Sequence, residues 1–353
     1  MDVLRPPLIN IGGRIYRRNL IKEEQYEEED DFSYIEPESE ELAEGEACDG
    51  PLIEQTDKGF RCAIDVPSAL YKYIIGKKGE TRRRLEADTK TSINIPKQGI
   101  EGQIVITGSQ KAAVSSALTR VEVLMESFRK KQPFTHFLSF PLNHSSIQEG
   151  FLRFKDEVLQ HCSQDHRVEE SIFQNPAKLH LTVGTLALLN DMEVRKASGY
   201  LQECQSFIRE IAEGKPLQLE VAGIEYMNDD PAMVDILYVK VNVKDGSEKL
   251  QTIADRLVEH FVSAGLMVRE WDRVKLHGTV MNTLFRKDST VADTGGAGRQ
   301  TTAEREAFDA RNILKKFGSF HFGEFELKTV QLSQRFSTDC TGYYTCAGSV
   351  SVS

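Results

Sequence analysis

The chain has 353 residues, of which 40% are hydrophobic and 28% are charged, so two or three domains with sizeable cores are expected. No uncharged apolar run approaches the roughly 18 residues that suggest a membrane span. An acid at position 2 and two nearby prolines are untypical of a signal peptide. The six cysteines include no CxxC pair, which argues against a zinc ribbon or disulfide framework and favours a reducing compartment.

The net charge of −10 is unevenly distributed. Residues 22–54 hold 15 Asp and Glu against one Lys, whereas residues 56–131 hold 15 Lys and Arg against 8 acids. Such basic density favours a polyanionic partner, although by itself it is more typical of a solvated surface.

Two different segments precede the basic region. Residues 20–55 are predicted to be a disordered acidic leader because they offer too little apolar surface to offset chain entropy. The first 18 residues contain a short apolar, β-prone patch. This patch is interpreted either as a docking segment for another protein or as a strand packed on the body, and both readings stay open.

From residue 59 the hydrophobic pattern predicts the order βααββα in about 70 residues. The predicted strands are 60–66, 91–95 and 103–107, and the predicted helices are 68–75, 80–89 and 110–128.

Past Pro133 the pattern predicts a mixed α+β domain of about 220 residues. Its predicted strands are 134–140, 179–186, 217–226, 234–243, 274–284 and 324–336. Its predicted helices are 147–162, 192–211, 247–262 and 304–317, and residues 286–302 are predicted to be a loop.

The first candidate site is a turn between the two short helices of the basic region. Its residues are Gly76, Lys77, Lys78 and Gly79, and Arg82, Arg83 and Arg84 follow on the second helix. Glycine tolerates the dihedral angles of a tight turn and allows a phosphate backbone to approach closely. A GxxG string alone is more often a plain helix–helix turn, so its place in the βααββα order carries the interpretation.

Together these features resemble a KH domain of type I over residues 56–131. The resemblance implies that single-stranded RNA, or single-stranded DNA, is held by the turn, with the bases read in an apolar groove beside the second strand. The implied contact residues are Gly76, Lys77, Lys78, Gly79, Arg82 and Arg83. The alternative is a degenerate KH fold used only for packing.

The second candidate site is a repeated His-x-Thr sequence. Lys178–Val183 (KLHLTV) and Lys275–Val280 (KLHGTV) nearly copy one another. Because alternate residues of a strand share a face, Lys, His and Thr of each copy are expected to line up, with Leu179, Leu181 and Val183 facing the core. A lone strand histidine is usually structural, but the repetition favours a function. His144 and His161 also precede a serine by two residues, but they lack the strand context.

Two imidazoles that face one another suit phosphodiester chemistry. One can take a proton from water or a ribose hydroxyl while the other donates a proton to the leaving oxygen, each contributing about 10²–10⁴ in rate. An ordinary histidine pKa near 6.5 makes both protonation states available. Threonine hydroxyls can donate to the non-bridging phosphate oxygens. No Asp, Glu or Cys cluster with metal-ligand spacing accompanies the pair, so a metal-free reaction without a cofactor is predicted.

The repeat resembles the two HxT motifs of the 2H phosphoesterase superfamily (LigT-like), over residues 133–353. The resemblance implies a two-lobed fold in which each lobe contributes one motif to a central cleft, and cleavage of 2′,3′-cyclic or oligonucleotide phosphodiesters. It also implies that His180 and His277 are catalytic and that Thr182 and Thr279 bind the phosphate, with the acid and base roles left open. Lys178 and Lys275 lie outside the family motif. Gly278 replaces an apolar residue and is expected to loosen the packing behind its strand.

The combination resembles, essentially end to end, the subunit 1 family of the activating signal cointegrator 1 complex. Segments 134–137, 226–231 and 281–287 contribute to this resemblance. It implies a nuclear protein that associates with a helicase subunit and other subunits of the complex in transcription coactivation and DNA alkylation repair. The N-terminal apolar patch is a candidate for the helicase contact. The resulting prediction is a partner-docking segment and disordered acidic leader over residues 1–55, a KH domain over residues 56–131 and a 2H domain over residues 133–353. Its alternative function is a non-catalytic RNA-binding adaptor whose 2H cleft only holds a nucleotide or a strand end.

Overall fold

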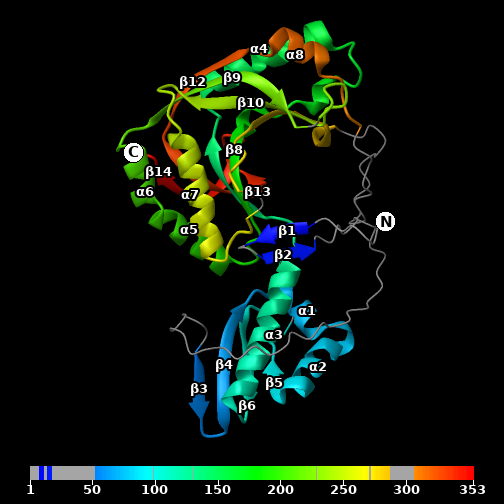
Figure 1. Cartoon of the computed structure of the whole chain (residues 1–353), viewed down its shortest axis with the longest axis vertical. Coiled ribbons are helices and arrows are strands. Elements are labelled where there is room, and N and C mark those ends of the chain that lie inside the picture. Colours follow the sequence, from blue (N-terminus) through cyan, green and yellow to red (C-terminus); the bar gives the residue numbers. More distant parts are fainter. Residues whose placement is uncertain are drawn as a thin grey trace. The chain divides into compact units, whose positions relative to one another are not determined.

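The computed structural model describes residues 8–11, 14–17, 52–97, 99–129, 131–227, 229–269, 272–286 and 306–353. The chain divides into two compact units, Met1–Gly50 and Pro51–Ser353. In the first unit, β1 (Leu8–Ile11) and β2 (Arg14–Arg17) pair as an antiparallel hairpin (Figure 1). The predicted disorder of the acidic leader falls almost entirely outside the described residues, so it stays a prediction.

The predicted βααββα order is confirmed. A short 3-10 turn (Ser68–Leu70) leads into the first helix. The strands are β4 (Gly59–Val66), β5 (Thr91–Asn94) and β6 (Gly102–Gly108), and the helices are α1 (Tyr71–Ile75), α2 (Glu80–Thr89) and α3 (Lys111–Arg129). Alternate apolar residues of the strands, such as Ile104 and Ile106, are fully buried with helix residues such as Val114. This core fixes the two short helices and the turn between them on the sheet.

The sequence did not predict a further strand, β3 (Ile53–Thr56), which pairs with β4 and gives the antiparallel strand order β3-β4-β6-β5. It lies across the predicted boundary between leader and KH domain at residues 55 and 56. Because β3 is an edge strand with three of its four residues exposed, it carries no alternation of apolar and polar residues that the sequence could reveal.

The second domain is built on one eight-stranded antiparallel sheet with the order β12-β9-β10-β11-β8-β7-β13-β14. The strands in chain order are β7 (His136–Pro141), β8 (His180–Leu186), β9 (Leu217–Tyr226), β10 (Ile236–Val243), β11 (Gly278–Asn282), β12 (His321–Leu327), β13 (Thr329–Thr338) and β14 (Tyr344–Ser351). Each half of the sheet contributes one central strand, β11 or β8, and the halves meet where these two strands pair.

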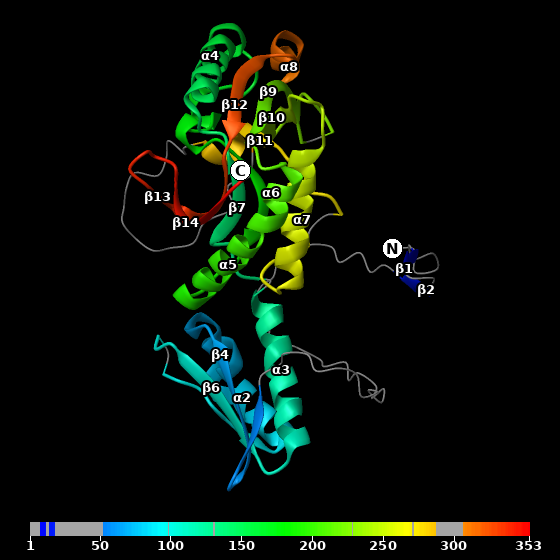
Figure 2. The ribbon, with the colours of Figure 1, turned by 90° about the vertical axis from the view of Figure 1, so that its left-hand side faces the viewer.

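Five helices cover this sheet and bury one hydrophobic core against it. They are α4 (Ser145–Cys162), α5 (Asp191–Glu203), α6 (Gln205–Ile211), α7 (Lys249–Ser263) and α8 (Arg311–Phe317). Helix α7 packs on β8 and β10, whereas α5 and α6 pack on β14. Figure 2 shows the far end of the β13–β14 hairpin curling out from the body of the domain. None of the helices in the described residues combines the length and the apolar character that crossing a membrane requires.

The sequence prediction differs from the structure mainly near the C-terminus. In the described part of the predicted helix 304–317, residues 306–310 are not helical and the helix begins at Arg311, because Phe308 instead forms a strand-like bridge with Val234. The predicted strand 324–336 is two strands, β12 and β13. Strand β14 was missed because its small and polar residues lack an apolar alternation. The predicted helix 192–211 is interrupted at Cys204, and the predicted strand 274–284 is regular only over β11.

Candidate functional site

The two His-x-Thr sequences lie side by side at the centre of the eight-stranded sheet. Strand β8 begins at His180, and β11 begins at Gly278, directly after His277. The middle residues of the motifs, Leu181 and Gly278, are Cα partners in the antiparallel pair. Antiparallel pairing therefore places His180 opposite Thr279, and Thr182 opposite His277.

The four predicted site residues share one face of the sheet. Leu181 points the other way and is fully buried in the core. Leu179 and Val183, which were also predicted to face the core, are buried as well, with at most 5% of the residue surface exposed. His180, Thr182, His277 and Thr279 are half-buried. The structure thus brings together all four residues that the sequence selected, on the face that does not enter the core.

The two imidazoles are oriented by equivalent backbone contacts. Nδ1 of His180 lies 2.7 Å from the Lys178 carbonyl oxygen, and Nδ1 of His277 lies 2.6 Å from the Lys275 carbonyl oxygen. Because a carbonyl oxygen only accepts, Nδ1 carries the hydrogen in both rings, and Nε2 is the basic nitrogen of each neutral ring.

The prediction that the motif lysines would line up with the histidines on the strands is wrong. Lys178 closes a 3-10 turn (Pro176–Lys178) before β8, and Lys275 precedes β11. Proline at the start of that turn and the Asn175 side chain, which accepts from the Ala177 N–H, bend the chain there. The contribution of both lysines to histidine orientation comes from their backbone carbonyls.

Burial lowers the pKa of both histidines below the ordinary value of about 6.5 that was expected from the sequence. Loss of solvation lowers the pKa of His180 to about 4, and the nearby charge of His277 acts in the same direction. Loss of solvation also lowers the pKa of His277, assisted by the Lys275 ammonium. The hydrogen bond from each ring to a backbone carbonyl raises the pKa, but it offsets the lowering only in part. In the free protein both rings are therefore neutral at pH 7.

The expectation that Gly278 loosens the packing behind its strand is wrong. A Cβ atom at Gly278 would lie 2.8 Å from Cγ2 of Val239 and 3.0 Å from Cδ1 of Leu142. These side chains and Leu181 occupy the space that a larger residue would need. Glycine at this position allows close packing between the two motif strands.

Aromatic rings that the sequence analysis did not select surround the two histidines. The ring centroids of Phe137 and Tyr344 lie 5.0 and 5.3 Å from that of His180, and the centroid of Tyr238 lies 5.6 Å from that of His277. Tyr238 is also the Cα partner of Thr279, and its hydroxyl donates to Glu225 at 2.9 Å. These residues lie far from the motifs in the chain, so no local sequence signal identifies them.

The GKKG turn of the KH domain adopts left-handed backbone conformations. Gly76 has a φ of 71°, and a Cβ there would lie 2.1 Å from Oγ1 of Thr81. Lys78 and Gly79 have φ values of 52° and 79°. Glycine is therefore required at Gly76 by both its backbone and its neighbour.

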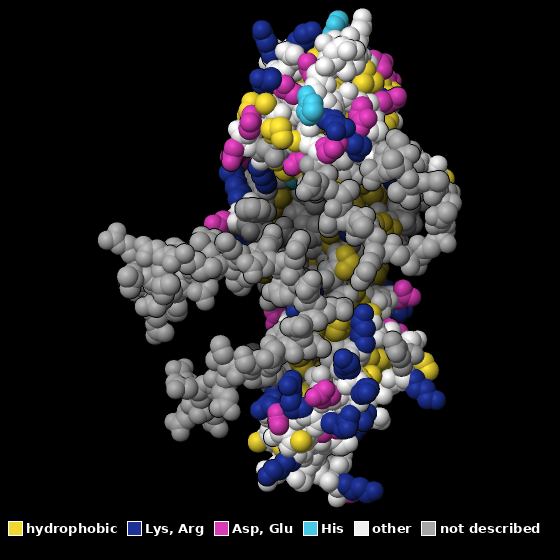
Figure 3. All heavy atoms as spheres, turned by 90° about the vertical axis from the view of Figure 1, so that its right-hand side faces the viewer, with side chains coloured by type: hydrophobic (Ala, Val, Ile, Leu, Met, Phe, Trp, Pro, Cys, Tyr) yellow, Lys and Arg dark blue, Asp and Glu magenta, His cyan; other side chains and the backbone are white. Residues whose placement is uncertain are grey.

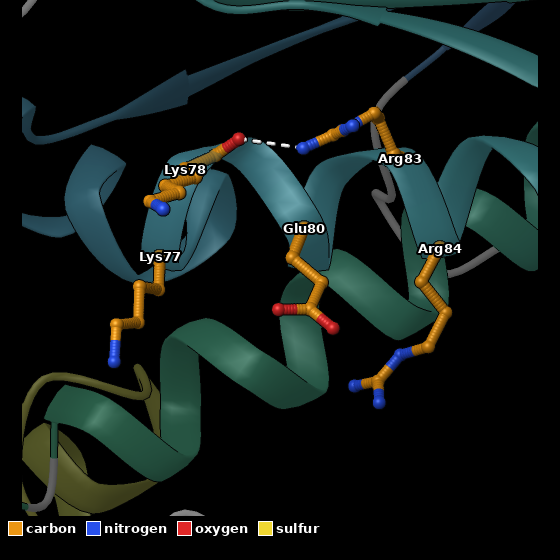
Figure 4. A pocket seen from close by; sticks show the side chains of 5 residues that line it. All are labelled: Lys77, Lys78, Glu80, Arg83 and Arg84. Carbon is orange, nitrogen blue, oxygen red and sulfur yellow. Dashed lines mark hydrogen bonds between the residues drawn. The ribbon is translucent and has the colours of Figure 1, made fainter.

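Arg83 holds this turn from within the protein. Its Nη2 donates to the Lys78 carbonyl oxygen at 2.7 Å, and its Nε donates to the Gly79 carbonyl oxygen at 3.3 Å. Figure 4 shows Arg83 reaching back to the turn, whereas Lys77, Glu80 and Arg84 extend on the other side. Arg82 forms an ion pair with Glu86 at 3.7 Å. The two arginines predicted to contact nucleic acid thus bind protein groups.

A hollow of about 810 Å³ lies at the turn and is predominantly basic. It is lined by Lys77, Lys78, Glu80, Arg83 and Arg84. On the face drawn in Figure 3, Lys and Arg side chains gather over the KH domain. Glu80 is the one acid in the lining and was not foreseen, although its position directly after Gly79 could have suggested it.

Potential metal ligands lie elsewhere in the sheet. Among the described residues, the cluster whose ligand atoms are close enough to hold an ion is Glu220, His321 and Glu324, on β9 and β12. Glu324 already accepts from Lys244 at 2.6 Å. This cluster lies on β9 and β12 and not on the motif strands β8 and β11.

The fold and the paired motifs define a KH domain followed by a 2H phosphoesterase-like domain. Residues 61–123 match the KH domain family, and residues 134–352 match the family described as AKAP7 2′5′ RNA ligase-like domain. Mouse activating signal cointegrator 1 complex subunit 1 is 52% identical over 358 residues, which cover 100% of both chains. The chain therefore belongs to the activating signal cointegrator 1 complex subunit 1 family.

More distant similarities cover smaller shares of the chain. Human A-kinase anchor protein 7 isoform gamma is 27% identical over 223 residues, or 63% of this chain and 58% of that protein. The crystal structure of Escherichia coli LigT in apo form is 13% identical, covers 62% of this chain and 98% of its own, and superposes with a TM-score of 0.34.

Proposed function

We propose that the chain binds single-stranded RNA through its KH domain and cleaves a phosphodiester at the paired His-x-Thr motifs without a metal. The observation that carries the catalytic part is the antiparallel pairing of the motifs through Leu181 and Gly278. It supports a centre in which two similarly oriented imidazoles and two hydroxyls surround a single phosphate.

In this mechanism the Nε2 of one neutral histidine takes the proton of the attacking hydroxyl, either water or a ribose hydroxyl. The new P–O bond forms as the bond to the leaving oxygen breaks, and the second histidine, protonated in the bound state, gives its proton to that oxygen. The anionic phosphate favours this protonation because an opposite charge raises a histidine pKa. Thr182 and Thr279 donate to the non-bridging oxygens as their charge grows. His180 and His277 can exchange roles according to the direction in which the substrate lies.

The KH part of the proposal rests on the basic turn. Lys77 and Lys78 supply charge, and the left-handed conformation at Gly76 allows close approach of a phosphate backbone. The name of the mouse relative favours membership of the activating signal cointegrator 1 complex. We therefore propose a nuclear role beside the other subunits of that complex, a helicase among them, in coactivation and alkylation repair.

The test is a cleavage assay in EDTA with the purified full chain and end-labelled single-stranded RNA, 2′–5′-linked RNA and 2′,3′-cyclic nucleotides. The parent is expected to cleave at least one substrate, and a His180→Ala, His277→Ala variant is expected to cleave none. His161→Ala is a matched control, because His161 also precedes a serine by two residues but lies on α4.

The outcomes separate the two functions. Cleavage that survives the double substitution would contradict the assigned roles. Tight RNA binding without cleavage by the parent, on every substrate and with the helicase partner added, would instead support a binding adaptor.

A further inference from the structure

Beyond the histidines, the β13–β14 hairpin carries an aromatic residue that the proposed cleavage does not use. Phe336 is 82% exposed, more than any other large hydrophobic side chain of the described residues. Lone exposed apolar residues need no explanation, but Phe336 contacts Arg335 and lies on the hairpin whose Tyr344 contacts His180.

A bulge in β13 produces this exposure. Ser333 pairs with Cys346 and Thr338 pairs with Tyr344, so residues 334–337 lie opposite the single residue Thr345. Within the bulge, the Arg335 N–H donates at 2.9 Å to the carbonyl oxygen of Thr135, which directly precedes β7. Extra residues of this kind bend a strand and redirect its side chains.

Arg335 lies between two aromatic rings. Its guanidinium carbon is 4.0 Å from the ring centroid of Phe134 and 4.6 Å from that of Phe336. Its Nη1 also donates to the Phe134 carbonyl oxygen at 3.4 Å. The guanidinium therefore supports Phe336 from within the protein while the ring stays exposed to solvent.

The group is linked to the candidate catalytic centre by Tyr344. The Tyr344 ring meets the His180 ring edge-on at 5.3 Å, and the Lys178 ammonium lies 5.2 Å from the Tyr344 ring centroid. Burial raises the pKa of the Tyr344 hydroxyl, and the positive charge of Arg335 opposes that rise. Tyr344 itself pairs with Thr338, the residue at which the bulge that carries Phe336 ends.

We propose that Phe336, supported by Arg335, is a stacking platform for a nucleobase that flanks the phosphate bound between the motifs. This inference rests on the proposed function for the identity of its ligand, single-stranded RNA. Aromatic rings and guanidinium planes stack on unpaired bases, and the cations match the sugar–phosphate backbone. The platform makes an oligonucleotide a better substrate than a cyclic mononucleotide, which has no second base to place there.

The test uses the full chain with His277→Ala, which slows cleavage but leaves the His180–Tyr344 contact intact. Short single-stranded RNAs carry 2-aminopurine at successive positions, and fluorescence reports stacking. Quenching is expected at one position, and Phe336→Leu should remove it and weaken binding about tenfold. Phe336→Trp should retain both. Met233→Ala, a change at another exposed hydrophobic residue, is a matched control that should alter neither.

Unchanged quenching and affinity in Phe336→Leu would overturn the inference. A Phe336→Trp protein that loses as much quenching and affinity as Phe336→Leu would also overturn it. The failure of the proposed function is distinguishable. If the parent cleaves RNA but Phe336→Leu has the parent's KM for every oligonucleotide, only the platform is wrong. If the parent cleaves nothing but Phe336→Leu loses the quenching, the platform stands and the catalytic proposal is wrong.

Discussion

Gly278 is the Cα partner of Leu181, so the middle residues of the two His-x-Thr motifs face each other across the central strand pair. This contact fixes the distance between the motif strands, because a Cβ at Gly278 would press against Val239 and Leu142. The histidines and threonines lie on the opposite face, and their spacing depends on this contact in the core.

Gly278→Val is therefore expected to destabilise the protein by about 1–3 kcal/mol, as overpacking does, and to reduce cleavage more than binding. Urea unfolding and a cleavage assay measure the two effects. Gly199→Ala is the control, because Gly199 lies in α5 with no atom within 4 Å of a new Cβ, and alanine there should stabilise the helix slightly. A Gly278→Val protein with the parent's stability would refute the close packing.

Thr182→Val and Thr279→Val each remove a hydroxyl while nearly preserving shape. If the hydroxyls donate to the phosphate as charge develops, each change should lower kcat about 10²–10³-fold with a smaller effect on KM. Thr185→Val, on β8 but outside the motif, should leave kcat unchanged. An effect on KM alone would mean that the hydroxyls bind substrate and transition state equally.

The pH dependence of kcat/KM follows from the lowered pKa of both histidines. Catalysis needs one protonated and one neutral ring, whichever ring takes each role. In the free protein that state is most populated between the two apparent pKa values, from about 4 to a value below 6.5. The profile is therefore expected to peak on the acid side of pH 6.5 and to fall toward pH 8. A maximum above pH 7 would show that the free rings are not desolvated in this way.

Lys77→Asp with Lys78→Asp should weaken the binding of single-stranded RNA. If both ammonium groups contact phosphates, the slope of log affinity against log salt should become less steep by about 1.4, since each contact to a single strand contributes about 0.7. Lys111→Asp, at an exposed lysine of α3, makes the same change at one lysine outside the turn and is the control for each single substitution. Binding that is unchanged across the salt titration would refute the KH role.

Arg83→Leu is expected to act differently, because Arg83 donates to the carbonyls of Lys78 and Gly79. Removing it should loosen the turn and lower RNA affinity while leaving the salt slope close to that of the parent. A slope reduced by about 0.7 would instead show that Arg83 contacts a phosphate when RNA is bound. Filter binding at several salt concentrations distinguishes the two results.

Local patterns predicted most of the fold. The long amphipathic helix α3 and the strands β6, β8 and β9 lie within a residue or two of their predicted bounds, because burial of one face imposes a period that the sequence displays. Edge strand β3 and strand β14 were missed, since neither alternates apolar and polar residues. The residues before Arg311 were misassigned because pairing with Val234 outweighs local helix preference.

The four motif residues could be selected from the sequence because they repeat. Their surroundings could not, since Tyr344, Phe137 and Tyr238 reach the histidines only through strand pairing. The tight turn was predicted from its glycines, but the inward contact of Arg83 depends on where the second helix begins. The role of Gly278 was misjudged because its partners, Leu142 and Val239, lie on other strands and loops.

The pairing of the two motifs has a local two-fold character, in which each histidine faces the threonine of the other copy. A nearly symmetric set of donors does not by itself dictate the polarity of a bound strand. That choice must fall to the groups that break the symmetry: Phe137 and Tyr344 around His180, and Tyr238 with its Glu225 partner beside His277. Exchanging these neighbours, rather than the motifs, is the route to a protein that reads its substrate in the reverse direction.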